Sequence, residues 1–270
     1  MNPAKHTSLN EVQKDNVRNI INLFGEELKN ICGKCMDVGC GPGDITTSIL
    51  LPSLDPKAVI IGTDISTAMV KYAQKTYGDN ERLEFEILDI EIESLPEKYL
   101  SKFDHIFSFH TLHWCNDARR IFQNMYCMLQ PGGTILVFFG VSHATIDVIK
   151  KMTQDIRFAP YLQRKFGFPF SDSARPCEEL TVLLESIGFN IKHCEIQAQD
   201  FSNINTNAFL SSIFAMFTFL DAMPPIEKKE FMDDFVREYH NKVNHGNEQH
   251  NKAETIDLHY YFIVYAQKTK

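Results

Sequence analysis

Apolar residues in the first 140 positions gather into short runs, and stretches with helical spacing lie between them. We predict strands at 58–62, 83–90, 103–109 and 134–139, together with a strand that ends at Val38. Helical spacing is clearest over residues 9–30, where one face would carry Val17, Ile20, Ile21, Phe24 and Leu28. Because strands alternate with helices, the pattern indicates an α/β fold with a parallel, doubly wound sheet and right-handed crossovers.

Prolines, glycines and capping residues predict where these elements end. Pro52 should close a helix over 45–51, and Ser66 should cap a helix that begins near residue 68. A helix over 119–129 would lead into a turn at Pro131-Gly132-Gly133.

The pattern changes after Gly140. Residues 141–176 contain no clean strand, a helix over 178–186 is stopped by Gly188, and strands are expected at 190–199 and 259–266. A helical, apolar segment over 203–243 is broken at Met223-Pro224-Pro225. Two interpretations of this phenylalanine-rich half stay open. It is ordinary core under the sheet, or, as we favour, a cap over an apolar tunnel with Phe209, Phe214, Met216, Phe217, Phe219 and Phe231 among its lining.

The candidate chemistry begins at Met36-Asp37-Val38-Gly39-Cys40-Gly41-Pro42-Gly43, where an apolar run ends in three alternate glycines. Glycine allows a sharp turn and a close approach of backbone to a ligand, and the helix that follows offers free N–H groups. Dinucleotide folds use a G-x-G-x-x-G spacing for pyrophosphate, whereas the spacing here is G-x-G-x-G with an acid, Asp37, two residues earlier. A carboxylate would repel a pyrophosphate but suits an ammonium group, so the loop favours S-adenosylmethionine over NAD.

A second acid, Asp64, ends the next strand about 20 residues past the glycines, where folds of this class commonly bind ribose hydroxyls. A carboxylate suits that role because it can accept hydrogen bonds from both hydroxyls at once. A plain turn residue is the second interpretation of Asp64.

Composition narrows the classes of function. The formal net charge is −8 and no basic stripe is visible, which disfavours nucleic acid as a partner. The N-terminal residues hold no apolar signal core, and the longest apolar segment, 209–220, is too short to span a bilayer. Seven scattered cysteines suggest no disulfide framework, so we expect a cytoplasmic protein. Cys32-x-x-Cys35 has no matching second pair, and His110 and His113 have no third ligand, so no metal is expected.

The glycine loop, Asp64, Leu88-Asp89-Ile90 and Leu129-Gln130-Pro131-Gly132-Gly133 together resemble the class I S-adenosylmethionine-dependent methyltransferases over residues 30–140. That resemblance implies a Rossmann-like, seven-stranded, mostly parallel sheet with helices on both faces and an α-helical cap. Residues 9–15, 62–66, 69–73 and 108–114 more narrowly resemble the insect juvenile hormone acid O-methyltransferases. We therefore expect one domain over 1–270, with a cofactor-binding core at 30–140 and helical substrate-cap inserts at 141–180 and 203–250.

The resemblance also implies residue roles. The methionine end of the cofactor would contact Asp37 and Gly39, the ribose and adenine would lie against Asp64 and Ile65, and the adenine amino edge against Asp89 and Ile90. The other positions expected to bind cofactor are Cys40, Gly41, Gly43, Met69 and Ser108. The substrate carboxylate would be held by Gln13, His113 and Trp114. The family often has a non-glycine where this chain has Gly41, a departure that does not threaten cofactor binding.

Fold rules bring two of these stretches together. In an open parallel sheet the ligand crevice lies at the carboxyl ends of the strands, where the strand order reverses. Under a 3-2-1-4-5 order, the glycine loop after the first strand would meet His113-Trp114 after the fourth. Without the resemblance, Trp114 is more simply a core aromatic, His113 a loop histidine and Gln13 a solvated polar residue; with it, we favour function for them.

A carboxylic acid suits such a site because it is ionised at pH 7 and needs neither a general base nor a metal. Neutral donors can hold one carboxylate oxygen, whereas a lysine or arginine would stabilise the ground state too strongly. We predict methyl-ester formation on a small apolar acid, either farnesoic acid, juvenile hormone acid or a fatty acid; a homodimer is compatible with this hypothesis. The alternatives are a class I methyltransferase acting on another small molecule and a cofactor-binding paralogue or partner subunit without activity.

Overall fold

A computed structural model describes residues 3–162, 167–245 and 256–269. The described residues form one seven-stranded sheet in the order β3-β2-β1-β4-β5-β7-β6. The strands are β1 Lys34–Val38, β2 Val59–Asp64, β3 Leu83–Ile87, β4 Phe103–Phe109, β5 Leu129–Ser142, β6 Phe189–Asp200 and β7 Leu258–Lys268. Strands β1 to β5 pair in parallel, and β7 is antiparallel to both β5 and β6. The predicted mostly parallel sheet is confirmed, with its order reversing between β1 and β4.

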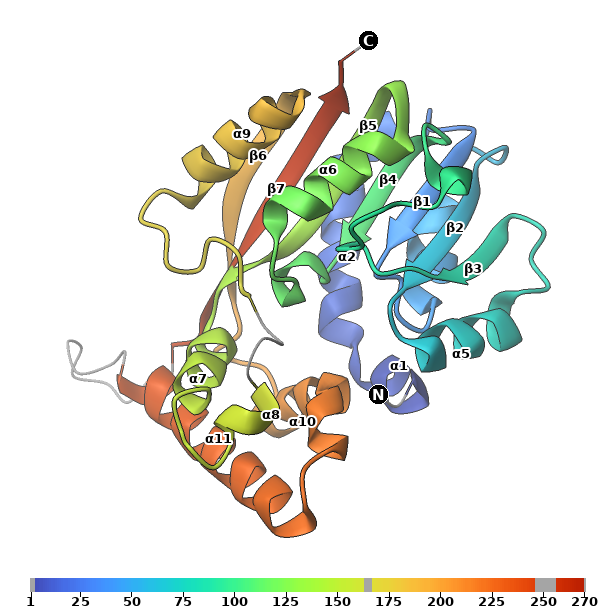
Figure 1. The fold of residues 1–270 in the computed structure, drawn as a ribbon. Helices are drawn as coiled ribbons and strands as arrows, with labels where there is room; N and C mark the ends of the chain where they lie inside the picture. The colour runs from blue at the N-terminus through green and yellow to red at the C-terminus, as the bar shows by residue number, and fades with distance from the viewer. Residues whose placement is uncertain (1–2, 163–166, 246–255, 270) are drawn as a thin grey trace.

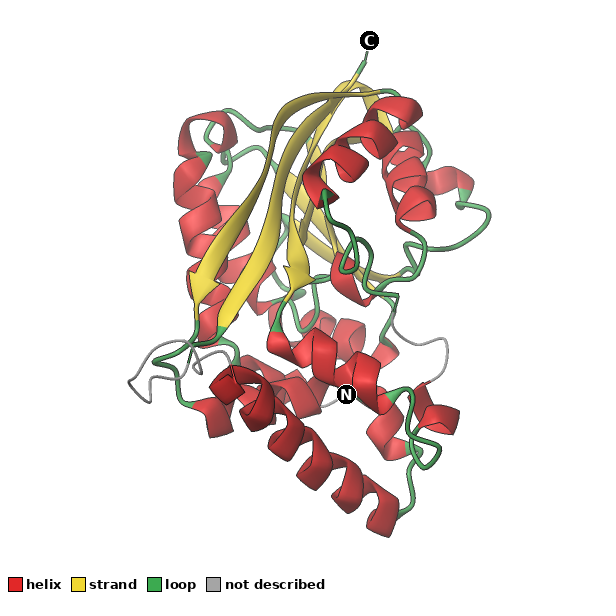
Figure 2. Cartoon of the chain, turned by 90° about the vertical axis from the view of Figure 1, so that its left-hand side faces the viewer, coloured by secondary structure: helices red, strands yellow, loops and turns green. Residues whose placement is uncertain are grey.

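Helices cover both faces of this sheet (Figure 2). The helical elements are α1 Pro3–Leu9, α2 Glu11–Leu23, α3 Gly25–Leu28, η1 Thr46–Leu50, α4 Leu51–Ser53, α5 Thr67–Tyr77, η2 Glu97–Tyr99, η3 Leu112–Trp114, α6 Ala118–Met128, α7 Ala144–Met152, α8 Ala159–Leu162, α9 Pro176–Ile187, α10 Thr206–Met216, η4 Thr218–Asp221 and α11 Pro225–His245. Alternate residues of β5 point to opposite faces, so Phe138 joins one buried apolar cluster while Val137 and Phe139 join the other.

A layer of helices lies at one end of the sheet, opposite to the C-terminus of the chain (Figure 1). This layer, which we call the helical cap, consists of α7, α8, α10, η4 and α11. Its interior is built from phenylalanines in edge-to-face contact: the Phe158 and Phe231 ring centroids are 5.2 Å apart, and those of Phe219 and Phe231 are 5.3 Å apart. The expected break at Met223-Pro224-Pro225 separates η4 from α11. Of the expected inserts, residues 163–166 and 246–250 lie outside the described residues.

Several predicted boundaries are confirmed. Strand β4 spans the predicted residues 103–109, and Ser66 caps α5 by accepting a hydrogen bond from the Met69 amide at 3.4 Å. Gly188 ends α9 in the left-handed conformation, with φ of +117°. These boundaries depend on local backbone chemistry, which the sequence displays directly.

Four predicted boundaries are wrong. Residues 9–30 form parts of three short helices, because Phe24 leaves helical geometry with ψ of 22°. The helix at 45–51 passes Pro52 and ends at Ser53; residues 46–50 form a wider π turn, which makes room for the proline ring. Strand β3 ends at Ile87, so Asp89 lies in the loop beyond it.

The fourth error concerns Pro131-Gly132-Gly133, which lies inside β5 and is not a turn between elements. The register with β4 shifts between Leu129 and Thr134, so the intervening residues bulge from a continuous strand. Gly132 has φ of +84°, and its carbonyl accepts a hydrogen bond from the side-chain amide of Gln267 at 2.8 Å. The glycine therefore serves a bulge that an antiparallel neighbour holds in place.

Candidate active site

The glycine loop leaves β1 at the point where the strand order reverses. The amides of Gly39 and Cys40 both donate to the Thr63 carbonyl, at 2.7 and 2.9 Å, which joins the loop to β2. Gly39 has φ of +75°, and a Cβ there would lie within 2.1–2.5 Å of the Thr111 side chain. Thr111 in turn donates to the Gly39 carbonyl at 3.1 Å, so the loop after β4 lies directly on the loop after β1.

Asp64 ties the middle of the loop to the end of β2. Its two carboxylate oxygens accept hydrogen bonds from the Gly41 amide at 3.0 Å and from the Ser66 amide at 2.7 Å. A Cβ on Gly41 would meet no atom within 4 Å, whereas one on Gly43 would meet Phe85 at 2.9 Å. Gly41 therefore borders open space, and Gly43 is packed against β3.

Asp37 is a buried carboxyl group below the loop, and its side chain accepts a hydrogen bond from the Thr46 hydroxyl at 2.6 Å. Burial raises the pKa of Asp37 to about 7; the Thr46 hydrogen bond lowers it and the charge of Asp64 raises it further. A nearby cation would offset the cost of burying this charge. The site is thus suited to a positively charged group.

The other predicted cofactor residues are spread along the same end of the sheet. Ile65 has 66% of its surface exposed beside Asp64, an apolar side chain open to a ligand, whereas Met69 is buried in α5. Ile90 is buried, and exposed Asp89 accepts from the Glu91 amide at 2.9 Å two strands away from β1. The Ser108 hydroxyl donates to the Val38 carbonyl at 2.8 Å, so it joins β4 to β1 beneath the loop.

His113 is buried on η3, and its hydrogen-bond partner fixes which ring nitrogen carries the proton. The Gly140 amide donates to Nδ1 at 3.2 Å, so the neutral imidazole carries its proton on Nε2. Burial, together with the charge of His110, lowers the pKa of His113 to about 3. At neutral pH this residue is an uncharged hydrogen-bond donor.

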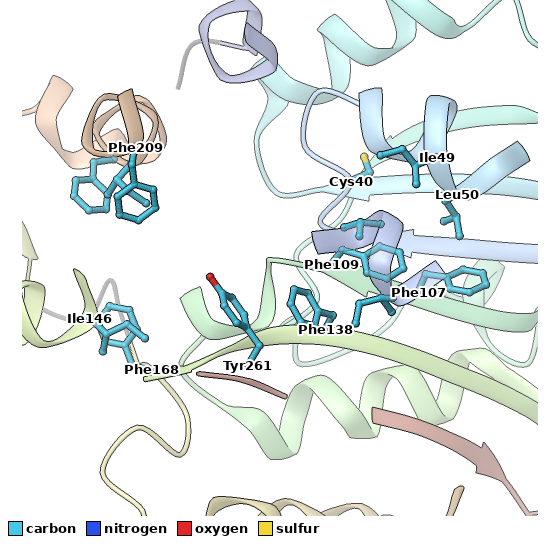
Figure 3. Close-up of a cluster of buried hydrophobic side chains, with 14 of the residues drawn as sticks. Cys40, Ile49, Leu50, Phe107, Phe109, Phe138, Ile146, Phe168, Phe209 and Tyr261 are labelled. Carbon is cyan, nitrogen blue, oxygen red and sulfur yellow. The ribbon is translucent and has the colours of Figure 1, made fainter. Parts of the chain in front are cut away.

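Trp114 connects this histidine to the helical cap. Its ring centroid lies 4.6 Å from that of His113, 5.9 Å from that of Phe168 and 6.2 Å from that of Phe217. Figure 3 shows Phe168, Ile146 and Phe209 on the cap side and Cys40, Phe109 and Phe138 on the sheet side, with the Tyr261 hydroxyl pointing toward the cap.

Gln13 comes to the same region from α2. Its backbone faces the His110 imidazole and raises the pKa of that group, although burial dominates and lowers this pKa to about 3. The Gln13 side-chain oxygen is buried, and no partner for it occurs among the described residues. The structure thus places Gln13 against His110, three residues before His113, which itself contacts Trp114, while Asp89 lies beyond the end of β3.

Some residues of the site escaped the sequence analysis. Asp44, directly after the third glycine, accepts from Asn10 at 3.0 Å and pairs with Lys14 at 3.2 Å, which holds α2 on the loop. Two threonines were also missed: Thr46 donates a hydrogen bond to Asp37, and Thr111 donates one to the Gly39 carbonyl. The position of Asp44 and Thr46 on the helix after the glycines was an available signal; nothing in the sequence indicated Lys14.

S-adenosylmethionine fits this set of residues. Asp37 offers an anionic group to the positive end of the cofactor, Gly41 leaves room for close approach, and Asp64 and Ile65 offer a carboxylate beside an exposed apolar surface. Among the described residues, no group of three or more His, Cys, Asp or Glu could hold a metal ion. In that same part of the chain, no helix combines the length and apolar character needed to cross a membrane.

Comparison with known proteins agrees with this geometry. A family described as "Methyltransferase domain" matches residues 36–135. A solved structure of Haemonchus contortus phosphoethanolamine N-methyltransferase 2, in complex with phosphomonomethylethanolamine and S-adenosylhomocysteine, shares the fold with a TM-score of 0.55. It is 19% identical, and the match covers 95% of this chain and 53% of that one. Fold and site define a class I, S-adenosylmethionine-dependent methyltransferase.

Two relatives of similar length show which family the chain belongs to. The juvenile hormone acid O-methyltransferase of Drosophila melanogaster is 30% identical over 276 residues, covering 100% of this chain and 93% of that protein. The enzyme of the same name from Bombyx mori is 30% identical over 252 residues, covering 89% and 87%. The chain belongs to the juvenile hormone acid O-methyltransferase family.

Proposed function

We propose that the acceptor is an apolar carboxylic acid of the sesquiterpenoid class, juvenile hormone acid or farnesoic acid, and that the product is its methyl ester. The observation that carries this proposal is His113, a neutral Nε2–H donor packed against Trp114, between the glycine loop and the phenylalanine-rich cap. The full-length likeness to enzymes named for juvenile hormone acid supports the same acceptor.

When bound, S-adenosylmethionine supplies a methyl group on a positively charged sulfur. The chain's contribution on this side is to bind and orient: Asp37 would hold the cationic end, and Asp64 and Ile65 the nucleoside. The glycine loop provides backbone without side chains, so that the ligand can come close.

On the acceptor side the chain needs to move no proton. A carboxylic acid with a pKa near about 4 to 4.5 is ionised at neutral pH, so its oxygen is already nucleophilic. The Nε2–H of His113, the indole N–H of Trp114 and the Gln13 amide would hold the carboxylate and leave a lone pair of one oxygen free to react. Neutral donors suit this task, since strong ionic binding would stabilise the acid more than the transition state.

The helical cap would enclose the hydrocarbon part of the acceptor. Aromatic contacts lead from half-buried Trp114 on η3 through Phe217 to Phe231 inside the cap, a continuous apolar path. Burial of each CH₂ contributes about 0.8 kcal/mol, so a terpenoid chain gains much of its affinity here. Such a packed environment also excludes water from the reacting groups.

The seven cysteines are all unpaired, which supports a reducing, cytoplasmic setting.

The test is transfer of a labelled methyl group from S-adenosylmethionine to a panel of apolar acids and to the matching alcohols and amines. We expect labelled ester from farnesoic or juvenile hormone acid and no product from the alcohols. His113→Phe keeps an aromatic ring but removes the donor, and should lower kcat/KM by about tenfold to a hundredfold. Labelled product from amines alone, or full activity in His113→Phe, would contradict the proposal.

A further inference from the structure

The N-terminus of α7 begins beside His113. This helix follows β5 directly, and His143 is the residue immediately before its first turn. The His143 and His113 ring centroids are 6.3 Å apart. Gly140 lies between the rings: a Cβ there would be 3.4 Å from His143 Nε2 and 3.6 Å from His113 Cγ. The absence of a side chain at Gly140 therefore leaves the two imidazoles side by side.

Two polar groups at this helix N-terminus are buried without a partner among the described residues. They are Nδ1 of His143, whose residue is 6% exposed, and the hydroxyl of Thr145, which is fully buried. His143 makes no side-chain capping bond to the helix. The first N–H groups of a helix also lack partners within it and carry partial positive charge. With its proton on Nδ1, His143 would be a buried donor without a partner, which is destabilising, and an anion would supply the missing acceptor.

The His143 ring is held by a chain of buried contacts. It stacks on His259 with centroids 4.7 Å apart, and His259 is itself stacked on Phe201 at 3.9 Å. Asp257 accepts from His259 Nε2 at 3.0 Å and also from the Tyr239 hydroxyl of α11. Side chains from three separate segments therefore set the orientation of a ring whose own Nδ1 has no partner.

His143 is a neutral group at physiological pH. Burial lowers its pKa well below the ordinary value, and the charges of His259, His113 and His110 lower it further. A neutral imidazole has one N–H to donate, as the proposed chemistry of His113 also requires.

We propose that the N-terminus of α7, with His143 and Thr145, is a second subsite for the acceptor's carboxylate, next to His113. This inference rests on the proposed function and adds a determinant of specificity to it. Because the subsite attracts an anion, it selects the ionised acid over the corresponding alcohol. The methyl ester carries no charge, so the same subsite binds the product less tightly and favours its release.

Trp114, the single tryptophan of the chain, provides a direct readout. Its fluorescence should report binding of farnesoic acid, or of farnesol as the uncharged control, in the presence of S-adenosylhomocysteine. His143→Phe preserves the stacking on His259 and removes the donor, and should raise the Kd for the acid by about tenfold while leaving farnesol unaffected. His143→Asn places an amide nitrogen near the position of Nδ1 and should restore most of the acid affinity.

Thr145 offers a matched pair of variants. Thr145→Val is isosteric without the hydroxyl and should weaken the acid alone, whereas Thr145→Ser should bind as the wild type does. Equal weakening of acid and alcohol in His143→Phe, failure of His143→Asn to restore affinity, or unchanged acid binding would each overturn the subsite. A wild-type protein that neither binds nor methylates an apolar acid would instead overturn the proposed function, and the inference with it.

Discussion

Asp37 and His113 are two buried residues whose pKa values move in opposite directions for the same physical reason. Burial raises the pKa of the Asp37 carboxyl to about 7 and lowers that of the His113 imidazole to about 3. At neutral pH the His113 imidazole is therefore uncharged in the protein without ligand, whereas about half of the Asp37 carboxyl groups are protonated. Asp37 is suited to regain its charge when a cation binds, whereas His113 stays a neutral donor throughout.

The first prediction concerns Asp37 and the pH dependence of cofactor binding. A cation binds the ionised carboxylate, so affinity for S-adenosylmethionine should rise with pH up to about 7 and then level off, with a proton released on binding below that pH. Asp37→Asn should weaken binding by about tenfold or more at pH 8 and abolish this dependence. Titration calorimetry in two buffers of different ionisation enthalpy measures both effects; an unchanged pH profile in the variant would refute the assignment.

The second prediction compares two glycines of the loop. Both have positive φ, +75° at Gly39 and +56° at Gly41, so alanine is strained at either position. A Cβ on Gly39 also overlaps Thr111, whereas one on Gly41 meets nothing. Gly39→Ala should lower the free energy of unfolding by about 2–4 kcal/mol, and Gly41→Ala by about 1 kcal/mol. Denaturant titration of both variants separates clash from strain, and equal losses would show that Thr111 exerts no constraint.

At the scale of elements, α2 is attached to the cofactor site through the residue after the third glycine. Lys14 and Asp44 leave only 13% and 6% of their side chains exposed, and Asn10 donates to the same carboxylate. Two charges paired out of water depend on each other, because removal of one leaves the other buried alone. Because Gln13 lies on α2 next to Lys14, the same contacts also hold Gln13 against His110.

The third prediction concerns the loss of the Lys14–Asp44 ion pair. Lys14→Met keeps the length and apolar stem of the side chain, and should destabilise the protein by about 1–3 kcal/mol while raising the Kd for S-adenosylmethionine. The matched control is Lys29→Met, whose partner Glu26 is exposed and whose loss should change neither quantity. Both variants are compared by chemical denaturation and calorimetry; similar effects from the two would show that burial of the Lys14–Asp44 pair is irrelevant.

Elements with local signals were predictable, and those that depend on distant partners were not. Strand β4, the Ser66 cap and the Gly188 stop follow from a short apolar run, side-chain capping and positive φ, which neighbouring residues determine. The bulge at residues 130–133 and the early start of β5 depend on pairing with β4 and β7, which no local pattern reveals.

The same distinction holds for the site. The spacing of the glycine loop and Asp64 predicts a cofactor site. The rule that ligands bind where the strand order reverses then predicts His113-Trp114 across from them. His143 and His259 were not predicted as site residues, because they are brought together only by stacking between β7 and the start of α7. At the start of β7, His259 and Tyr261 are buried while Leu258 and Tyr260 are exposed, and Asp257, the residue before the strand, is buried as well. This period-two pattern of buried polar residues was available as a signal.

At the scale of the whole molecule, buried imidazoles should make stability depend on pH. The pKa values of His110 and His113 fall from 6.5 to about 3 on folding, so the unfolded chain binds more protons between these values. Their contribution is fully present above pH 6.5 and is lost as pH falls toward 3. Asp37 acts oppositely, since its raised pKa gives stability that is lost as pH rises from 3.8 through 7.

The fourth prediction follows from this balance. His143, whose pKa burial also lowers, adds to this loss, and Asp64, whose pKa burial raises, opposes it as Asp37 does. Because the imidazoles outweigh the carboxyls, the free energy of unfolding of the cofactor-free protein should fall by about 2–3 kcal/mol between pH 6.5 and 5. His113→Phe should flatten the slope. Urea titrations at closely spaced pH values provide the measurement, and stability that rises on acidification over this interval would mean that the histidines are charged in the folded protein.

The central claim is that a carboxylate, held by neutral donors beside Trp114, takes the methyl group. The most direct measurement uses S-adenosylmethionine with a deuterated methyl group and farnesoic acid carrying ¹⁸O in both carboxyl positions, followed by mass spectrometry of the product. The predicted result is a methyl ester that contains the deuterated methyl and retains both heavy oxygens. Loss of one heavy oxygen, or transfer of the label only to nitrogen or carbon acceptors, would contradict it.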